Sequence, residues 1–172
     1  MEYRNARLSD IPSIMEIIGQ AQAYMERLGI DQWNNGYPNT SIFEQDIAKD
    51  SCYLFYENEA PEKILGLITV QFEGEPAYEK IHGQWLSDQP YGVIHRTALT
   101  ANRRGTGLSN ELIQLAQHLT ALKSLHSLRV DTHEDNLPMR KLLERNGFTS
   151  CGIVYYNGPD FSLRRIGYEK LL

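Results

Sequence analysis

The sequence is short of cysteine and has no long hydrophobic run, and both shortages narrow the choice of protein class. Cys52 and Cys151 are its only cysteines among 172 residues. No apolar stretch approaches the ~20 residues needed to span a bilayer, and the opening MEYRNARLSD lacks the apolar region of a secretory signal. We therefore expect a cytoplasmic protein without membrane contact, in which buried free thiols are favoured over a disulfide.

Positive charge is also in short supply. The chain carries 17 lysines and arginines against 22 aspartates and glutamates, a net charge of −5. This disfavours a general nucleic-acid binder, which normally has a basic face. Local basic pairs at Arg103–Arg104 and Arg140–Lys141 suit a small anionic ligand instead. With 41% hydrophobic residues, the chain can bury a core, and we expect residues 1–172 to form a single domain.

Apolar periodicity predicts a mixed α/β chain whose helices return to one sheet. Ser9 is the expected cap of a first helix that Gly29 ends. Residues 74–90 are expected to form a connection with some extended structure. The other predicted helices cover residues 40–49, 107–122 and 137–146, and the predicted strands cover 2–8, 52–57, 63–73, 92–100, 127–132, 148–156 and the C-terminal SLRRIGYEKLL.

The segment ANRRGTGLSNEL, residues 101–112, places two arginines and two glycines directly before a helical pattern. A helix N-terminus presents N–H donors and partial positive charge, so it can hold phosphates. Gly105 and Gly107 would let an anion approach the backbone closely, and Arg103 or Arg104 would add a cation. The alternative is an ordinary strand–helix turn. A P-loop is disfavoured because no lysine follows the glycines, and a dinucleotide site because asparagine replaces its third glycine.

These features together resemble the GCN5-related N-acetyltransferase (GNAT) family. Its members carry Q/R-x-x-G-x-G/A between the fourth strand and third helix, which this chain matches with RGTGLS, although Ser109 departs from the last position. HEDNLPMRKLLERNGF is similar to the family element that begins at an asparagine, here Asn136, and ends in Gly-Phe. ALTANRRG and the opening YRNARLSDIPSIMEI also match in order, so the resemblance covers nearly the whole chain.

The resemblance implies the GNAT fold and acetyl-CoA as co-substrate. That fold is mixed α/β, with a largely antiparallel central sheet of about seven strands flanked by about four helices, splayed between the fourth and fifth strands. Backbone amides of the glycine segment would bind the pyrophosphate. The residues implied to bind the cofactor are Ala98, Leu99, Arg103, Arg104, Gly105, Thr106, Gly107, Leu108, Ser109 and Asn136.

In this family the acetyl group passes directly from the thioester to an amine. The backbone N–H of Leu99 would donate to the thioester oxygen as charge develops there. A lysine-like amine has a pKa of ~10.4, so freeing its lone pair at pH 7 costs about 4.6 kcal/mol and favours a general base. His95 is the leading candidate, since strand alternation places it on one face with Leu99. A structural histidine is the alternative, and Glu134 and Glu73 are further candidates.

This chain lacks a tyrosine that many relatives use as the catalytic acid, so another acid has to be considered. Many relatives have a tyrosine seven residues after the asparagine, where this chain has Leu143. Because a thiol has a pKa of only ~8.5, we interpret the loss as tolerable, with solvent or Tyr155, Tyr156 or Tyr168 protonating the sulfur. Tyr155 is the catalytic residue that we select. The alternative function is a catalytically weak acyl-CoA-binding sensor or partner module of the same fold.

The acceptor side is only weakly marked in the sequence. QWNNGYP, residues 32–38, lies between the first two helices, where relatives build much of the acceptor pocket. Trp33 and Tyr37 are therefore expected to bind substrate, with Glu73, Glu75 and Trp85 closing the opposite side; the alternative is that the aromatics pin the loop to the core. A small-molecule or peptide amine is the expected acceptor. Since relatives are often dimers, a homodimer is also possible.

Metal and covalent chemistry are disfavoured. Asp131, His133 and Asp135 alternate along the chain, but no further cluster completes a metal site. Cys151 has no histidine evidently placed to activate it as a nucleophile. We therefore expect no metal cofactor and no covalent enzyme intermediate.

Overall fold

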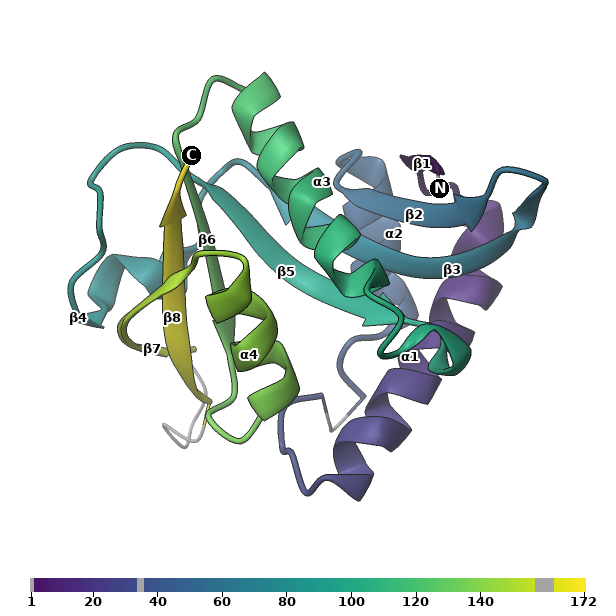
Figure 1. The fold of residues 1–172 in the computed structure, drawn as a ribbon, viewed down its shortest axis with the longest axis horizontal. Helices are drawn as coiled ribbons and strands as arrows, with labels where there is room; N and C mark the ends of the chain where they lie inside the picture. Colours follow the sequence, from purple (N-terminus) through teal and green to yellow (C-terminus); the bar gives the residue numbers. More distant parts are fainter. Residues whose placement is uncertain (1, 34–35, 157–162) are drawn as a thin grey trace. The chain divides into compact units, whose positions relative to one another are not determined.

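The computed structural model describes residues 2–33, 36–156 and 163–172, and these form two compact units (Figure 1). The first unit comprises residues 1–70 and 96–112, and the second comprises residues 71–95 and 113–172. The expectation of a single domain stays a prediction, and each unit is described by itself below.

The observed elements follow the predicted order closely. The helices are α1 (Ile11–Arg27), α2 (Thr40–Ala48), α3 (Leu108–Leu122) and α4 (Leu137–Arg145), with short 3-10 turns η1 (Leu8–Asp10), η2 (Pro76–Lys80) and η3 (Ala101–Arg103). The strands are β1 (Glu2–Asn5), β2 (Cys52–Glu57), β3 (Ala60–Gln71), β4 (His82–Gly83), β5 (Gly92–Leu99), β6 (Ser127–Thr132), β7 (Thr149–Tyr155) and β8 (Arg164–Leu171). None of the described helices combines the length and apolar character needed to traverse a bilayer.

The strands form an eight-stranded sheet in the order β1-β2-β3-β5-β6-β8-β7-β4. Among the strand pairs for which the described residues give a register, β5 and β6 alone run parallel. The expected fold class, a mixed and largely antiparallel sheet with four helices, is confirmed. The sheet has one strand more than the expected seven, because the short β4 joins its edge beyond β7.

The extra strand β4 depends on two glycines far apart in the sequence. His82 pairs with Ile153, and Gly83 pairs with Gly152. A Cβ added at Gly83 would lie 2.1 Å from the carbonyl oxygen of Cys151, so the two backbones can approach only because both residues lack side chains. Local periodicity carries no signal for such a contact, so the sequence predicts residues 74–90 as a connection with some extended structure but does not locate β4 in it.

The start of α1 also differs from the expectation. The first strand ends at Asn5 and not at residue 8, and Ser9 lies inside the turn η1, so that Asp10 occupies the cap position. The Asp10 carboxylate accepts two hydrogen bonds from the Arg4 guanidinium, at 2.7 and 2.9 Å, and one from the Arg7 amide at 2.7 Å. The bond from Arg4 is the main reason that the pKa of Asp10 lies below its ordinary value. This ion pair ends the strand early and begins the helix later.

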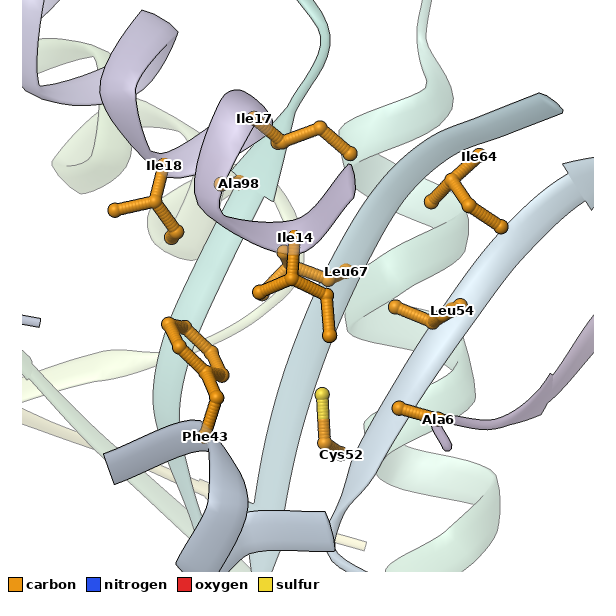
Figure 2. Close-up of a cluster of buried hydrophobic side chains, with 10 residues drawn as sticks. All are labelled: Ala6, Ile14, Ile17, Ile18, Phe43, Cys52, Leu54, Ile64, Leu67 and Ala98. Atoms are coloured by element: carbon orange, nitrogen blue, oxygen red, sulfur yellow. The ribbon is translucent and has the colours of Figure 1, made fainter. Parts of the chain in front are cut away.

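The core of the first unit lies between α1, α2 and the strands β2 and β3 (Figure 2). Ile14 and Ile18 of α1 and Phe43 of α2 are fully buried, and they meet Leu54 and Leu67 of the strands. Ile14, Ile17 and Ile18 thus lie on the face of α1 that packs against the strands. Ala98 of β5 belongs to the same cluster.

The second unit has a separate aromatic cluster. Tyr78 of η2 is buried against Val93 of β5 and Val154 of β7, and Trp85 and Tyr91 pack on them. The Arg129 guanidinium lies 4.3 Å from the ring centroid of Trp85 and 3.8 Å from that of Tyr91. These contacts fasten the connection between β3 and β5 to the strands of this unit.

Candidate functional site

The glycine segment before α3 has the backbone conformation that its sequence suggested. Gly105 has φ +76° and Gly107 has φ +90°, values that favour glycine over residues with a Cβ. A Cβ added at either position would meet no atom within 4 Å, so both glycines face open space. The segment therefore exposes main chain at the point where a helix begins.

The rest of the segment fixes this turn in place. Leu108 is 2% exposed and anchors the first turn of α3 in the core. The Thr106 hydroxyl donates to the carbonyl of Arg103 at 2.7 Å, and the Asn110 amide donates to the carbonyl of Gly107 at 2.9 Å. A helix start held in this way, with small residues on its exposed side, is suited to an anionic ligand such as a pyrophosphate.

The two arginine side chains of the segment bind the protein itself. Arg103 forms an ion pair with Glu57 of β2. Arg104 donates to the carbonyl of Gln20 at 2.8 Å, and its guanidinium lies 4.5 Å from the ring centroid of Tyr24. Partial burial lowers the pKa of Arg104, although it stays charged at neutral pH. These arginines therefore hold the segment against α1 and β2, a role that sequence reasoning did not assign.

Strand β5 presents two different faces, as alternation predicted. His95, Thr97 and Leu99 are partly exposed, whereas Arg96 and Ala98 are buried. At its end, the Thr100 amide donates to the carbonyl of Leu65 at 2.9 Å. The side chains of His95 and Leu99 thus point to the less buried side of the strand.

In the second unit, the parallel pairing of β5 with β6 is short. Its register joins Gly92–Ile94 with Leu128–Val130. His95 is the next residue of β5, and its Nε2 atom lies 3.8 Å from a carboxylate oxygen of Glu75. The two side chains are only 11% and 15% exposed. A histidine near a carboxylate in a largely buried setting is an arrangement suited to accepting a proton.

Asp131, the next residue of β6, forms a second polar cluster in this unit. Its Oδ2 atom accepts hydrogen bonds from the hydroxyls of Tyr78, at 2.8 Å, and Tyr156, at 2.5 Å. Burial raises the pKa of Asp131, while the two phenols and the charge of Arg165 act to lower it. Sequence reasoning considered Asp131 only as a metal ligand, because its tyrosine partners lie 53 and 25 residues away.

A model of the acetyltransferase (GNAT) family matches residues 16–148, which is most of the chain. The chain belongs to the GNAT family of acetyltransferases. The resemblance inferred from the glycine segment and the element order is therefore confirmed. No curated protein matches the chain.

Solved structures agree with this assignment. This GNAT protein is similar to a GNAT acetyltransferase from Streptococcus agalactiae, with 29% identity, a TM-score of 0.84 and coverage of 99% of this chain and 95% of that one. A GNAT acetyltransferase from Listeria monocytogenes shares 24% identity, with a TM-score of 0.74 and coverage of 99% and 94%. A chain of the NatC complex bound to Gag peptide and CoA shares 14% identity, with a TM-score of 0.70 and coverage of 99% and 98%. The last two likenesses show the shared fold.

The structure places the candidate acids of this GNAT protein in different surroundings. Leu143, where many relatives have tyrosine, is fully buried in α4. The Tyr155 ring packs edge-on against His82 at 5.3 Å between centroids. The Tyr168 hydroxyl accepts from the Arg140 guanidinium at 3.1 Å. Tyr156 bonds Asp131. The catalytic role of Tyr155 stays a prediction.

The alternative bases lie at the surface. Glu73 is exposed, and Glu134 is paired with Arg164 at 2.6 Å, with both side chains about half exposed. The predicted cofactor residue Asn136 caps α4, where its side chain accepts from the Met139 amide at 3.2 Å. Among the residues that the structure describes, no group of three histidine, cysteine or acidic side chains is arranged to hold a metal ion.

The predicted acceptor residues are distributed over both units. In the first unit, Trp33 packs on the core cluster, and the Tyr37 hydroxyl accepts from the Arg96 guanidinium at 2.9 Å while its ring is 38% exposed. In the second unit, Trp85 stacks on Arg129 and donates from its indole to the carbonyl of Tyr78 at 2.9 Å. Trp33 and Trp85 therefore have packing roles, which leaves Tyr37 as the more exposed of the three aromatics.

Both cysteines are buried and unbridged, as expected. Burial is the main factor that raises the pKa of Cys52 to about 12, and it also raises the pKa of Cys151. Because the thiolate is the reactive form, we predict that neither thiol of the native protein reacts with a chromogenic disulfide reagent at pH 7.5. Absorbance of the released chromophore checks this, with the protein in denaturant as the control in which both thiols react. Rapid labelling of a native thiol would contradict the prediction.

Proposed function

We propose that the protein is an N-acetyltransferase that moves an acetyl group from acetyl-CoA to a primary amine of a small molecule or peptide. The observation that carries this proposal is the glycine segment of a GNAT family member, in which Gly105 and Gly107 adopt positive φ and face open space before α3. A diphosphate is the ligand group that such a helix start suits best.

The residues present fit the cofactor. The amides from Gly105 to Ser109 would hold the pyrophosphate, since the small side chains of this segment leave its main chain accessible. Bound acetyl-CoA supplies an acetyl thioester, whose carbonyl carbon is the electrophile. The Leu99 N–H is the proposed donor to the thioester oxygen, where negative charge develops during attack by the amine.

Removing a proton from the amine costs more free energy at pH 7 than protonating the leaving thiolate, so it is the step that most needs help from the protein. An alkyl amine is protonated at neutral pH, and its lone pair becomes available only after the N–H bond is broken. His95 is the proposed base because it is nearly buried and lies 3.8 Å from the Glu75 carboxylate, which favours the imidazolium that forms.

Turnover distinguishes the enzyme from a sensor of the same fold. The protein is incubated with acetyl-CoA and a panel of alkyl, aryl and peptide amines, and the released CoA thiol is measured together with the acetylated product by mass spectrometry. Saturable product formation on an amine supports the proposal. CoA binding without turnover of any amine would contradict it and favour the acyl-CoA-binding sensor.

We predict that His95→Ala lowers kcat/KM most strongly near pH 7, by about 10²-fold or more. The loss should shrink at alkaline pH, where the amine ionises without help from the protein. The measurement is the pH profile of kcat/KM from pH 6 to pH 10. His118→Ala is the matched control, since His118 is exposed on α3. A profile of the His95 variant parallel to that of the parent would remove His95 from this role.

A further inference from the structure

Among the described residues, the carboxylates of Asp46 and Glu169 are buried, and each is paired with an arginine. Asp46 accepts two hydrogen bonds from Arg96, at 2.9 and 2.7 Å. Glu169, which is fully buried, accepts from Arg129 at 3.0 Å. Direct pairing with a guanidinium is the usual way to compensate a buried carboxylate. These two side chains therefore have structural partners.

Asp131 is held differently. Among the described residues its hydrogen bonds come from the neutral hydroxyls of Tyr78 and Tyr156, and both end on Oδ2. Arg165 acts on the carboxylate through its charge, while its own Nη1 donates to the carbonyl of Arg164 at 2.9 Å. The two phenols fix the orientation of Asp131 but bring no positive charge to it, so no hydrogen-bonded guanidinium compensates this carboxylate in the way that Asp46 and Glu169 are compensated.

The position of Asp131 relates it to the proposed base within the second unit. Ile94 pairs with Val130 in parallel register, and His95 and Asp131 are the next residues of the two strands. Because side chains alternate along each strand, His95 and Asp131 both lie on the face opposite to that of the paired Ile94 and Val130. The turn η2 serves both, because Glu75 at its start lies near His95 and Tyr78 within it bonds Asp131. One short segment thus supports both polar groups.

We infer that Asp131 binds the acceptor of the reaction as an alkylammonium ion, through Oδ1, with Tyr78 and Tyr156 holding the carboxylate in place. This inference rests on the proposed N-acetyltransferase function and names the class of its substrate. The acceptor is an aliphatic amine that is cationic at neutral pH, and not an aryl amine, which is neutral there. The ion pair lasts until the ammonium loses a proton to the proposed base, His95.

A pair of tyrosines suits a carboxylate that binds a cation better than an arginine would. An arginine bound bidentately would occupy both oxygens and compete with an incoming ammonium. Tyr78 is 1% exposed and acts from inside the core, whereas Tyr156 is only partly buried.

Direct binding tests the inference without requiring turnover. Cyclohexylamine, a cation at pH 7.5, and cyclohexanol, its neutral isostere, are titrated calorimetrically into the protein saturated with CoA. We expect the cation to bind about 10- to 100-fold more tightly, as for a hydrogen bond to a charged group. Equal affinities of the two probes, or no binding of the cation, would overturn the inference. This comparison uses the parent protein and is independent of whether a variant folds.

The variant Asp131→Asn identifies the residue. It keeps the shape of the side chain and an oxygen that can accept from the phenols, but it removes the charge. We expect it to lose the 10- to 100-fold preference for cyclohexylamine while its affinity for CoA is unchanged. An unchanged preference would overturn the assignment to Asp131. If the parent binds the cation through Asp131 but acetylates no amine, the proposed function fails and the cation site stands.

Folding of this variant can be anticipated from the pKa of Asp131. Burial raises that pKa, so the stability that the group contributes is present at acidic pH and is lost as the pH rises through the folded-state pKa. Above that pKa the ionised carboxylate disfavours the folded state, a cost that a neutral asparagine does not have. Asp131→Asn should therefore melt at the same temperature as the parent or higher, which a thermal melt checks. When turnover is measured, the loss should appear in KM for alkyl amines and not in kcat.

Discussion

Replacing Gly107 with aspartate is expected to lower the affinity for coenzyme A by about a thousandfold. The added side chain enters the open space before α3, since a Cβ at Gly107 meets no protein atom within 4 Å. A carboxylate ~4 Å from a phosphate charge at an effective dielectric constant of about 20 costs about 4 kcal/mol, which is ~10³ in Kd. Calorimetric titration with CoA is the measurement.

Two control variants separate charge from backbone strain. Gly107→Ala has the same positive φ of +90° without the carboxylate, so it should lose much less affinity than Gly107→Asp. Gly29→Asp places a carboxylate at another open position of the same unit with φ +68°, and it should bind CoA as the parent does. If Gly107→Asp retained parental affinity while remaining folded, the pyrophosphate would have to bind elsewhere.

Much of the fold follows from periodicity that is local in the sequence. The patterns of residues 52–57 and 127–132 predict β2 and β6 with their observed bounds, and the other predicted strands and helices differ from the observed ones by a few residues at their ends. The glycine segment is also a local feature, because helix onset and glycine spacing are both visible in a dozen residues. Its backbone conformation could therefore be anticipated, as Gly105 and Gly107 show.

The parts that the sequence did not reveal are contacts between distant side chains. Alternation along β5 correctly separates His95 from Arg96, but it does not say that Arg96 meets Asp46, 50 residues away. Asp131 likewise meets Tyr78 across 53 residues. Arg104, although adjacent to the glycines, turns to Gln20 and Tyr24 of α1. Buried polar partners depend on how elements pack, and a single sequence without their packing does not contain that information.

The ion pair of Arg96 with Asp46 gives the largest expected effect on stability. The two side chains are 7% and 3% exposed. Asp46 also accepts from the Thr69 hydroxyl at 3.1 Å, and Arg96 donates to the Tyr37 hydroxyl at 2.9 Å. Asp46→Asn would leave the guanidinium charge buried against a neutral amide. We predict a loss of about 3–5 kcal/mol in the free energy of unfolding, measured by urea denaturation at pH 7.5.

Two further variants, one at a surface ion pair and one that removes both buried charges, show whether burial causes the loss of stability expected for Asp46→Asn. Glu134→Gln breaks the half-exposed pair with Arg164 and should cost about 1 kcal/mol or less. The double variant Asp46→Leu, Arg96→Met removes both buried charges and should recover most of the stability lost by Asp46→Asn, because no ion is then left uncompensated in the interior. If the double variant were less stable than Asp46→Asn, the stabilisation would come from the specific hydrogen bonds of the pair, including the one to Tyr37, and not from relief of an isolated charge. The same comparison bears on Tyr37, which is predicted to bind the acceptor. Arg96 is the residue that joins Tyr37 to β5.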